Sequence, residues 1–178
     1  DELKQLQIER LQSTLNRVYR NVAFYKHNFD AHRVNIERIK SIDALSELPF
    51  TTRDDLGKSY PYDMFAVPLR EIVRIHVTPG SKSTPIVVGF TRNDLRNWTE
   101  CVARILTAAG ITANDVVQIA FPHNLCMAGY GFSQGAEQIG ASVIPSSATS
   151  SGEKQVTIMK DFRTSALVCT PGYALDLS

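Results

Sequence analysis

The sequence predicts an α/β fold on three observations. An amphipathic helix pattern opens the chain, a loop rich in serine and threonine then separates two β-branched runs, and strand-like runs alternate with helix-like runs after residue 91. We expect an N-terminal helical arm, a β-hairpin, and then a βαβ, mostly parallel sheet with flanking helices. The predicted domains are an arm and linker over 1–60 and an α/β subdomain over 61–178.

The N-terminal arm is predicted from apolar residues that recur at helical spacing. They indicate one helix of about twenty residues, and they are Leu3, Leu6, Leu11, Leu15, Val18 and Val22. Such a stripe either docks on its own domain or forms a dimer seam; we expect docking, with a homodimer as the alternative. Aromatic residues extend the apolar surface into a second short helical region, with packing as their expected role: Tyr19, Phe24, Tyr25 and Phe29.

The segment 74–90 is predicted to form strand, loop and strand. Backbone N–H groups and hydroxyls in such a loop can converge on an anion, and Lys82 adds a positive charge that suits phosphate. An ordinary P-loop leads into a helix, whereas 86–90 re-enters a strand. Simple turn chemistry is the alternative that the residues leave open. The candidate phosphate-binding residues are Thr78, Gly80, Ser81, Lys82, Ser83 and Thr84.

After the hairpin, Thr91 and Asp94 predict a capping box at the start of a helix that runs to Ala109, with Gly110 as its C-cap. The apolar stripe expected on this helix is Leu95, Trp98, Val102, Ile105, Leu106 and Ala109. The predicted elements that follow are a strand at 116–121, a helix at 129–139, a strand at 142–144, a helix at 153–162 and a β-rich run at 165–170.

Charge and composition exclude several classes of function. A net charge of +1, with basic and acidic residues interleaved, gives no reason to expect binding to nucleic acid or to an anionic membrane. No apolar stretch approaches the length of a membrane span, so we expect a soluble cytoplasmic protein. Cys101, Cys126 and Cys169 lack metal-binding spacing, which predicts buried free thiols in a reducing compartment and no structural zinc.

The hairpin and its surroundings resemble the phenylacetate–coenzyme A ligase family of adenylate-forming enzymes, whose loop typically reads Ser-Ser-Gly-Thr-Thr-Gly-Lys-Pro. Gly80 and Pro85 keep the two anchors of that loop. Pro79 removes one N–H donor and Ser83 restricts a glycine position, which should weaken phosphate binding. Lys82 lies two positions before the family lysine, hence on the same face of an extended segment. Further matching stretches are 48–56, 60–61, 65–68, 87–91, 108–111, 135–137, 139–141, 161–163 and 170–175.

The segment that follows the 116–121 strand is the candidate acyl pocket. Ligands of open parallel sheets bind outside the carboxyl ends of the strands, and the resemblance places an aromatic-acid pocket at the matching segment. Its candidate residues are Phe121, Asn124, Cys126, Ala128 and Gly129, with an ordinary packed loop as the open alternative. The glycines at 129, 131 and 135 lack the spacing of a dinucleotide fingerprint, so helix packing is the better interpretation.

The resemblance implies ATP, Mg²⁺ and coenzyme A as cofactors, and activation of phenylacetate or a related aryl acid through an acyl-adenylate. Such ligases are longer than 178 residues. We therefore expect an N-terminal fragment that holds part of the adenylate-forming large domain and is inactive in isolation, with a nucleotide and a small aromatic carboxylate as partners. The alternatives are a truncated gene product and a degenerate, non-catalytic paralogue that acts as a binding or dimerisation module. No catalytic or metal-binding residue is assigned.

Overall fold

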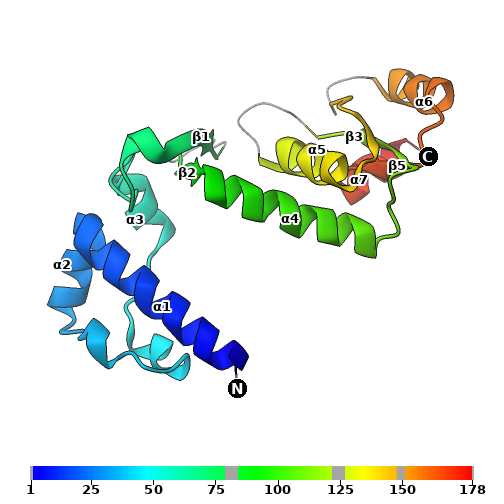
Figure 1. The fold of residues 1–178 in the computed structure, drawn as a ribbon. Coiled ribbons are helices and arrows are strands. Elements are labelled where there is room, and N and C mark those ends of the chain that lie inside the picture. The colour runs from blue at the N-terminus through cyan, green and yellow to red at the C-terminus, as the bar shows by residue number, and fades with distance from the viewer. Residues whose placement is uncertain (1, 79–83, 122–126, 148–150, 178) are drawn as a thin grey trace. The chain divides into compact units, whose positions relative to one another are not determined.

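The structure is a computed structural model that describes residues 2–78, 84–121, 127–147 and 151–177 (Figure 1). The chain divides into two compact units, one comprising Asp1–Val73 and Gly80–Gly89, the other Arg74–Pro79 and Phe90–Ser178. The predicted domain boundary after residue 60 stays a prediction.

The first unit is mainly helical. Its helices and 3₁₀ turns are α1 (Glu2–Asn21), α2 (Ala23–Ala31), η1 (Ile36–Arg38), η2 (Asp43–Glu47), α3 (Arg53–Lys58) and η3 (Leu69–Glu71). The predicted twenty-residue helix is confirmed as α1. Leu15 of α1, Phe29 of α2 and Ile39 are buried together and form the core of this unit. The helix therefore docks on its own unit, as expected.

The prediction that the apolar stripe of α1 docks on its own unit is wrong for the N-terminal end of the helix. Leu3 is 63% exposed and Leu6 is 42% exposed, whereas Leu15 is only 5% exposed. The helices and turns that bury α1 contact its second half, so its first two turns have no apolar cover among the described residues.

The longest described helix of the second unit begins at the capping box predicted for Thr91 and Asp94. The Thr91 hydroxyl accepts from the Asp94 N–H, and the Asp94 carboxylate accepts from the Thr91 N–H at 2.9 Å, which starts α4 (Arg92–Ala108). Ala109 is the C-cap, and Gly110 follows it with φ of 94°. The predicted apolar stripe is wrong at two residues, since Ile105 is 60% exposed and Ala109 is also exposed. Ile105 lies to one side of the face of α4 that carries the buried residues Val102, Ala103 and Leu106, and Ala109 is the C-cap, beyond the end of the helix.

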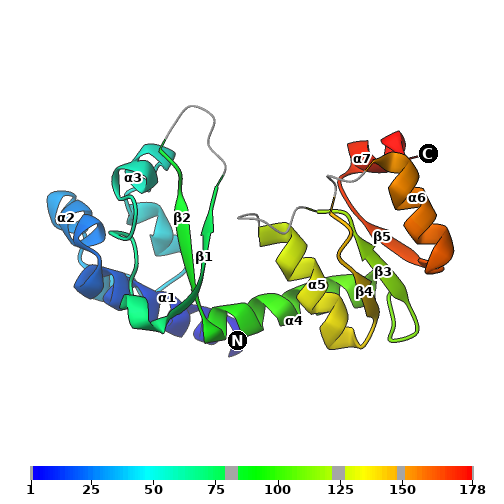
Figure 2. The ribbon, with the colours of Figure 1, turned by 90° about the horizontal axis from the view of Figure 1, so that it is seen from above.

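The sheet of the second unit is three-stranded and parallel, with the order β4-β3-β5 (Figure 2). Its strands are β3 (Val116–Ile119), β4 (Ser142–Ile144) and β5 (Ala166–Val168). In the register, Val117 of β3 lies opposite Val143 of β4 and Ala166 of β5. The connecting helices are α5 (Met127–Ile139) and α6 (Gly152–Asp161), and α7 (Pro171–Asp176) follows β5. The predicted βαβ alternation is confirmed.

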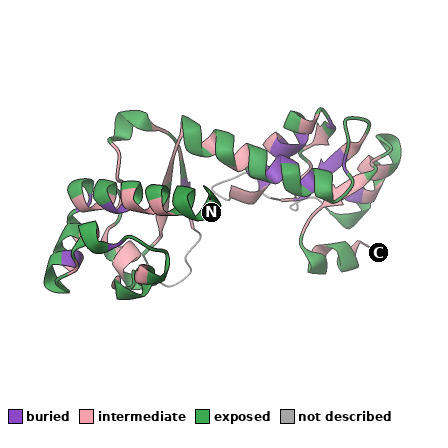
Figure 3. Cartoon of the chain, turned by 60° about the horizontal axis from the view of Figure 1, so that its bottom comes forward, coloured by how far each residue is buried: buried purple, intermediate pink, exposed green. Residues whose placement is uncertain are grey.

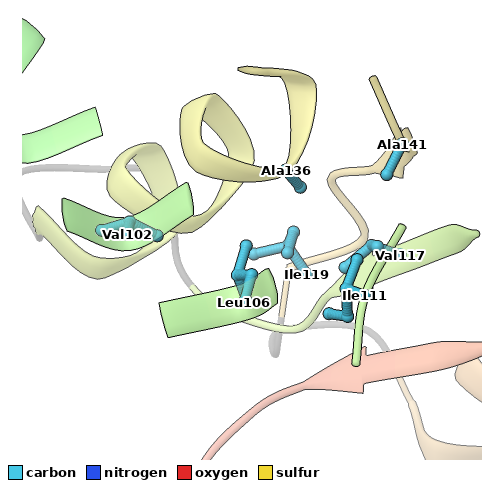
Figure 4. Close-up of a cluster of buried hydrophobic side chains, with 7 residues drawn as sticks. All are labelled: Val102, Leu106, Ile111, Val117, Ile119, Ala136 and Ala141. Atoms are coloured by element: carbon cyan, nitrogen blue, oxygen red, sulfur yellow. The ribbon is translucent and has the colours of Figure 1, made fainter. Parts of the chain in front are cut away.

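The two faces of this sheet are covered by different elements. Val117 and Ile119 of β3 join Leu106 of α4 and Ala136 of α5 in one buried cluster (Figure 4). The intervening Gln118 points to the opposite face, where it meets α6. Figure 3 shows buried residues along α5 and β3.

No helix in the described part of the chain is both long enough and apolar enough to cross a membrane. The cysteine prediction is partly wrong. Cys101 and Cys169 are free thiols, but Cys101 is exposed and Cys169 is only half-buried. Cys101 precedes Val102 on α4 and so lies beside the buried face rather than on it. Cys126 lies outside the described residues.

Candidate functional site

The predicted hairpin is present. β1 (Ile72–Val77) and β2 (Val87–Thr91) pair in a two-stranded sheet. Two candidate phosphate-binding residues are described: Thr78 follows β1 directly and is half-buried, and Thr84 lies before β2 and is exposed. The other four candidates lie outside the described residues, namely Gly80, Ser81, Lys82 and Ser83.

The first unit supports the hairpin at two glycines. A Cβ atom built on Gly89 of β2 would lie 2.7 Å from the Phe65 ring, so only glycine fits this approach without a shift. A Cβ atom on Gly57 of α3 would lie 3.6 Å from the Thr84 Cβ, an ordinary van der Waals distance. Thr84 therefore lies beside α3 while its side chain stays exposed.

Helix α3 is itself held by a capping box that the sequence analysis did not single out. The Thr52 hydroxyl accepts from the Asp55 N–H, and the Thr52 N–H donates to the Asp55 carboxylate at 2.8 Å. The Thr52 hydroxyl also donates to this carboxylate, and these bonds lower the pKa of Asp55 below its usual value. The signal was visible in the sequence as a threonine followed three residues later by an acidic side chain.

In the second unit, the later part of β1 contacts α5 through polar and aromatic side chains. Arg74 Nη1 donates to Gln134 Oε1 at 3.2 Å, and the Arg74 guanidinium carbon lies 5.2 Å from the centroid of the Tyr130 ring. The His76 ring is 6% exposed, with its centroid 6.1 Å from that of Tyr130 and 5.7 Å from that of Phe90. None of these residues was predicted from the sequence to belong to a site.

A cavity of about 10 Å³ lies beside these contacts. Its lining includes Arg74, His76, Phe90, Trp98 and Met127. This volume holds at most one water molecule. The cavity is therefore a small gap in the packing around His76 and has no room for a substrate.

Three candidate acyl-pocket residues are described. The Phe121 ring, just after β3, stacks on Phe132 of α5 with a centroid distance of 5.7 Å and an interplanar angle of 15°. Ala128 is half-buried and Gly129 is buried, both in the first turn of α5. Asn124 and Cys126 lie outside the described residues. Phe121 also packs against the core of the second unit, and its role in a pocket stays a prediction.

Gly131 and Gly135 of α5 serve helix packing. A Cβ atom on Gly131 would lie 2.1 Å from Nε1 of Trp98, and one on Gly135 would lie 2.5 Å from Cγ1 of Val102. Gly131 and Gly135 are four residues apart and hence on one face of α5, the face that meets α4. For Gly131 and Gly135 the interpretation as packing glycines is confirmed.

A buried chain of hydrogen-bonded amides, which was not predicted from the sequence, holds the segment that follows β4. Gln118 Nε2 donates to Gln155 Oε1 at 2.5 Å, and Gln155 Nε2 donates to the Ser147 carbonyl at 2.6 Å. The Thr164 hydroxyl donates to Gln118 Oε1 at 3.0 Å. The Ser147 N–H in turn donates to the carbonyl of Ile119 at the end of β3. The only hint in the sequence was a glutamine inside an apolar strand.

Among the residues that the structure describes, no three His, Cys, Asp or Glu side chains gather into a possible metal site.

Comparisons with known proteins confirm the resemblance to phenylacetate–coenzyme A ligases. No family model matches the chain. The phenylacetate-coenzyme A ligase of Escherichia coli (strain K12) is 42% identical over 177 residues, which are 99% of this chain and 40% of that ligase. That of Aromatoleum evansii is 40% identical over 98% of this chain, and that of Pseudomonas putida is 39% identical over 100% of it. The chain spans about 40% of the length of these curated relatives.

Solved structures of a 2-hydroxyisobutyryl-CoA ligase share the fold. The complex with 2-HIB-AMP and CoA in the thioesterification state matches with a TM-score of 0.90 and 28% identity, over 99% of this chain and 39% of that one. The postadenylation state in complex with 2-HIB-AMP matches with a TM-score of 0.89 and 27% identity.

Proposed function

We propose that this chain is part of an AMP-forming acyl-CoA ligase that activates phenylacetate or a related aryl acid. The observation that carries the proposal is 42% identity to a phenylacetate-coenzyme A ligase over 99% of the chain. The hairpin and the parallel sheet add structural support, since an acyl-CoA ligase crystallised with an acyl-AMP shares this fold at 27% identity.

In the proposed reaction, the hairpin holds the ATP phosphates while a carboxylate attacks the α-phosphate. Thr78 and Thr84 place hydroxyl groups at the two ends of the loop, and Lys82 supplies the positive charge as negative charge moves onto the leaving pyrophosphate. The coenzyme A thiol then displaces AMP from the acyl-adenylate. Bound Mg²⁺ would neutralise phosphate charge, and no described residue is assigned to it or to coenzyme A.

The aromatic class of acid is favoured by two observations. The curated relatives at 39–42% identity are named for phenylacetate, whereas the 2-hydroxyisobutyryl-CoA ligase is 27–28% identical. Phe121, which the resemblance assigns to an aromatic-acid pocket, also lies just after the carboxyl end of β3, where it stacks on Phe132.

A non-catalytic paralogue is the competing function, and the loop sequence is what favours it. Pro79 lacks the N–H that a serine would donate there, and Ser83 stands where the resembled loop has glycine. A paralogue of this kind would act through binding or dimerisation, and the exposed Leu3 and Leu6 of α1 would then be the first surface to test for a homodimer. A cytoplasmic location is part of the ligase proposal.

A coupled assay of AMP formation on the intact protein tests the proposal. With Mg·ATP and coenzyme A, we expect phenylacetate to release AMP faster than acetate or 2-hydroxyisobutyrate does. Release of AMP that no added carboxylate increases would favour the non-catalytic paralogue instead. The isolated 178-residue chain is expected to show no ligation in the same assay, since it spans only about 40% of its relatives.

A further inference from the structure

Phe121 continues the row of apolar side chains with which strand β3 faces α5. Val117 and Ile119 alternate along β3 and belong to the buried core of the second unit (Figure 4). Phe121 is the next residue in this alternation and packs against the same core. The Ala120 N–H donates to the Val168 carbonyl of β5 at 2.9 Å. The sheet therefore holds the backbone up to the residue that precedes Phe121.

Phe132 is the matching residue on helix α5. It lies one helical turn before Ala136, which is completely buried in the same core. Helix α5 follows β3 and leads to the parallel strand β4, so it begins at the carboxyl end of β3 and runs back along the sheet. The turn of α5 that carries Phe132 is therefore nearer to this strand end than the turn that carries Ala136.

The packing of α5 on α4 fixes the direction in which Phe132 projects. Gly131 directly precedes Phe132, and an added Cβ atom there would collide with the Trp98 ring. One turn later, a Cβ atom on Gly135 would lie 2.5 Å from Cγ1 of Val102. The two helices are thus in close contact on this face, and α5 cannot rotate about its axis without a steric clash.

The rings of Phe121 and Phe132 are stacked, with centroids 5.7 Å apart and an interplanar angle of 15°. A phenylalanine side chain has several rotamers, and stacking on a ring that α5 holds in place selects one of them for Phe121. Both side chains are half-buried, so the pair lies where the core of the second unit ends. Ligands of open parallel sheets bind beyond this end of the strands.

From this arrangement we infer that Phe132 is a positioning residue for the acid substrate. It holds the Phe121 ring in the orientation in which that ring packs against an aryl group, and it thereby sets the preference for aryl over aliphatic acids. The inference rests on the proposed function, which assigns Phe121 to the acyl pocket. Phe132 acts through Phe121, so its effect on acid preference should vanish when Phe121 is replaced.

The test compares kcat/KM of the intact protein for phenylacetate with kcat/KM for hexanoate, a linear aliphatic acid, in the coupled assay of AMP formation. The quotient of the two values is the aryl preference. Phe132→Leu removes the stacked ring and should lower the aryl preference by about 2- to 12-fold, the range that corresponds to one aromatic pair. The loss should come from a higher KM for phenylacetate, with the KM for ATP unchanged. Phe132→Tyr keeps the ring and should retain the preference.

Ile139→Ala is the matched control, because Ile139 is the last residue of α5 and packs against the same core at the other end of the helix. It should lower the stability of the protein without changing the aryl preference. A merely structural role for Phe132 would give the same result, since a smaller folded fraction reduces both kcat/KM values equally. If Phe132→Leu does not fold, Phe132→Met, which keeps most of the side-chain volume, takes its place.

A double-variant comparison tests whether Phe132 acts through Phe121. Phe121→Leu should lower the aryl preference, and the double variant Phe121→Leu/Phe132→Leu should lower it no further. A further loss in the double variant would mean that Phe132 acts on the acid by another route, which contradicts the inference.

An aryl preference that Phe132→Leu leaves unchanged would overturn the inference while the proposed function stands. The same holds if the unmodified protein forms AMP equally well with phenylacetate and hexanoate. If the unmodified protein forms no AMP with any carboxylate, the proposed function itself fails and the inference falls with it.

Discussion

Gln118 Nε2 donates a hydrogen bond to Gln155 Oε1 at 2.5 Å, and both side chains are completely buried. Each amide has a second partner: Gln118 accepts from Thr164, and Gln155 donates to the carbonyl of Ser147. No buried side-chain nitrogen or oxygen in the described residues lacks a hydrogen bond. This pair therefore fixes α6 and the segment after β4 against the central strand of the sheet.

Gln155→Leu should destabilise the chain by about 1–3 kcal/mol, because it removes the side-chain acceptor at 2.5 Å from Gln118 Nε2 and the side-chain donor to the Ser147 carbonyl. The double variant Gln118→Leu/Gln155→Leu should cost less than the sum of the two single changes, since the buried Gln118 amide that has lost this bond is removed as well. Urea unfolding of the three variants measures this difference. Strict additivity would show that the two amides do not interact.

Gly135→Ala should destabilise the packing of α4 on α5. The added methyl group would lie 2.5 Å from Val102 Cγ1 and 3.0 Å from the backbone nitrogen of Ala103, and a backbone atom cannot rotate away. Overpacking of this kind costs about 1–3 kcal/mol. Gly172→Ala in α7 is the matched control, because no atom lies within 4 Å of its added methyl group. The control should be neutral or slightly stabilising in thermal unfolding, since alanine favours helix.

Asp115 should make stability depend on pH in the acid range. The hydroxyl of Ser165 donates to its carboxylate at 2.7 Å, and the N–H and hydroxyl of Thr112 donate as well, so the pKa of Asp115 is lowered from the usual 3.8. The folded chain thus favours the ionised carboxylate. This stabilisation is complete above pH 3.8 and is lost as the pH falls through the lower pKa of the folded chain.

Asp115→Asn should therefore be less stable than the unmodified chain at pH 7, with a difference that narrows as the pH falls below 3.8. Ser165→Ala, which removes the bond with the largest effect on this pKa, should give an intermediate result. Urea unfolding measured from pH 7 to pH 2 makes the comparison. A difference that stays constant over this range would contradict the assignment.

Lys82→Ala in the intact protein should raise the KM for ATP by roughly 10–100-fold, as expected for loss of a charged hydrogen bond of about 1.5–3 kcal/mol. The KM for coenzyme A should change little, because the proposal places Lys82 on the polyphosphate. Lys160→Ala, an exposed lysine near the end of α6, is the control. If Lys82→Ala and Lys160→Ala have the same KM for ATP, Lys82 does not belong to the phosphate site.

Most of the fold could be predicted from the sequence because local signals agreed with the tertiary structure. The capping box at Thr91 and Asp94 fixed the start of α4, and the run at 142–144 coincides with β4. The hydrophobic pattern was less reliable about which side a residue faces. Ile105 fits the helical period, yet the glycine face of α5 covers only the neighbouring side of α4.

The site was less predictable, since its supports are contacts between distant segments. Arg74 and Gln134 are 60 residues apart, and Gln118 and Gln155 are 37 residues apart, so no local period links either pair. Composition did suggest the hairpin and its hydroxyl-rich loop. It could not show that Phe121 stacks on Phe132, because that contact depends on how α5 packs beside the end of β3.

The most direct test of the central claim is exchange of labelled pyrophosphate into ATP by the intact protein, without coenzyme A. Acyl-adenylate formation is reversible, so we predict exchange that requires phenylacetate. Exchange that is absent with every carboxylate supplied, or that proceeds equally well without one, would contradict the assignment of this chain to an acyl-activating ligase.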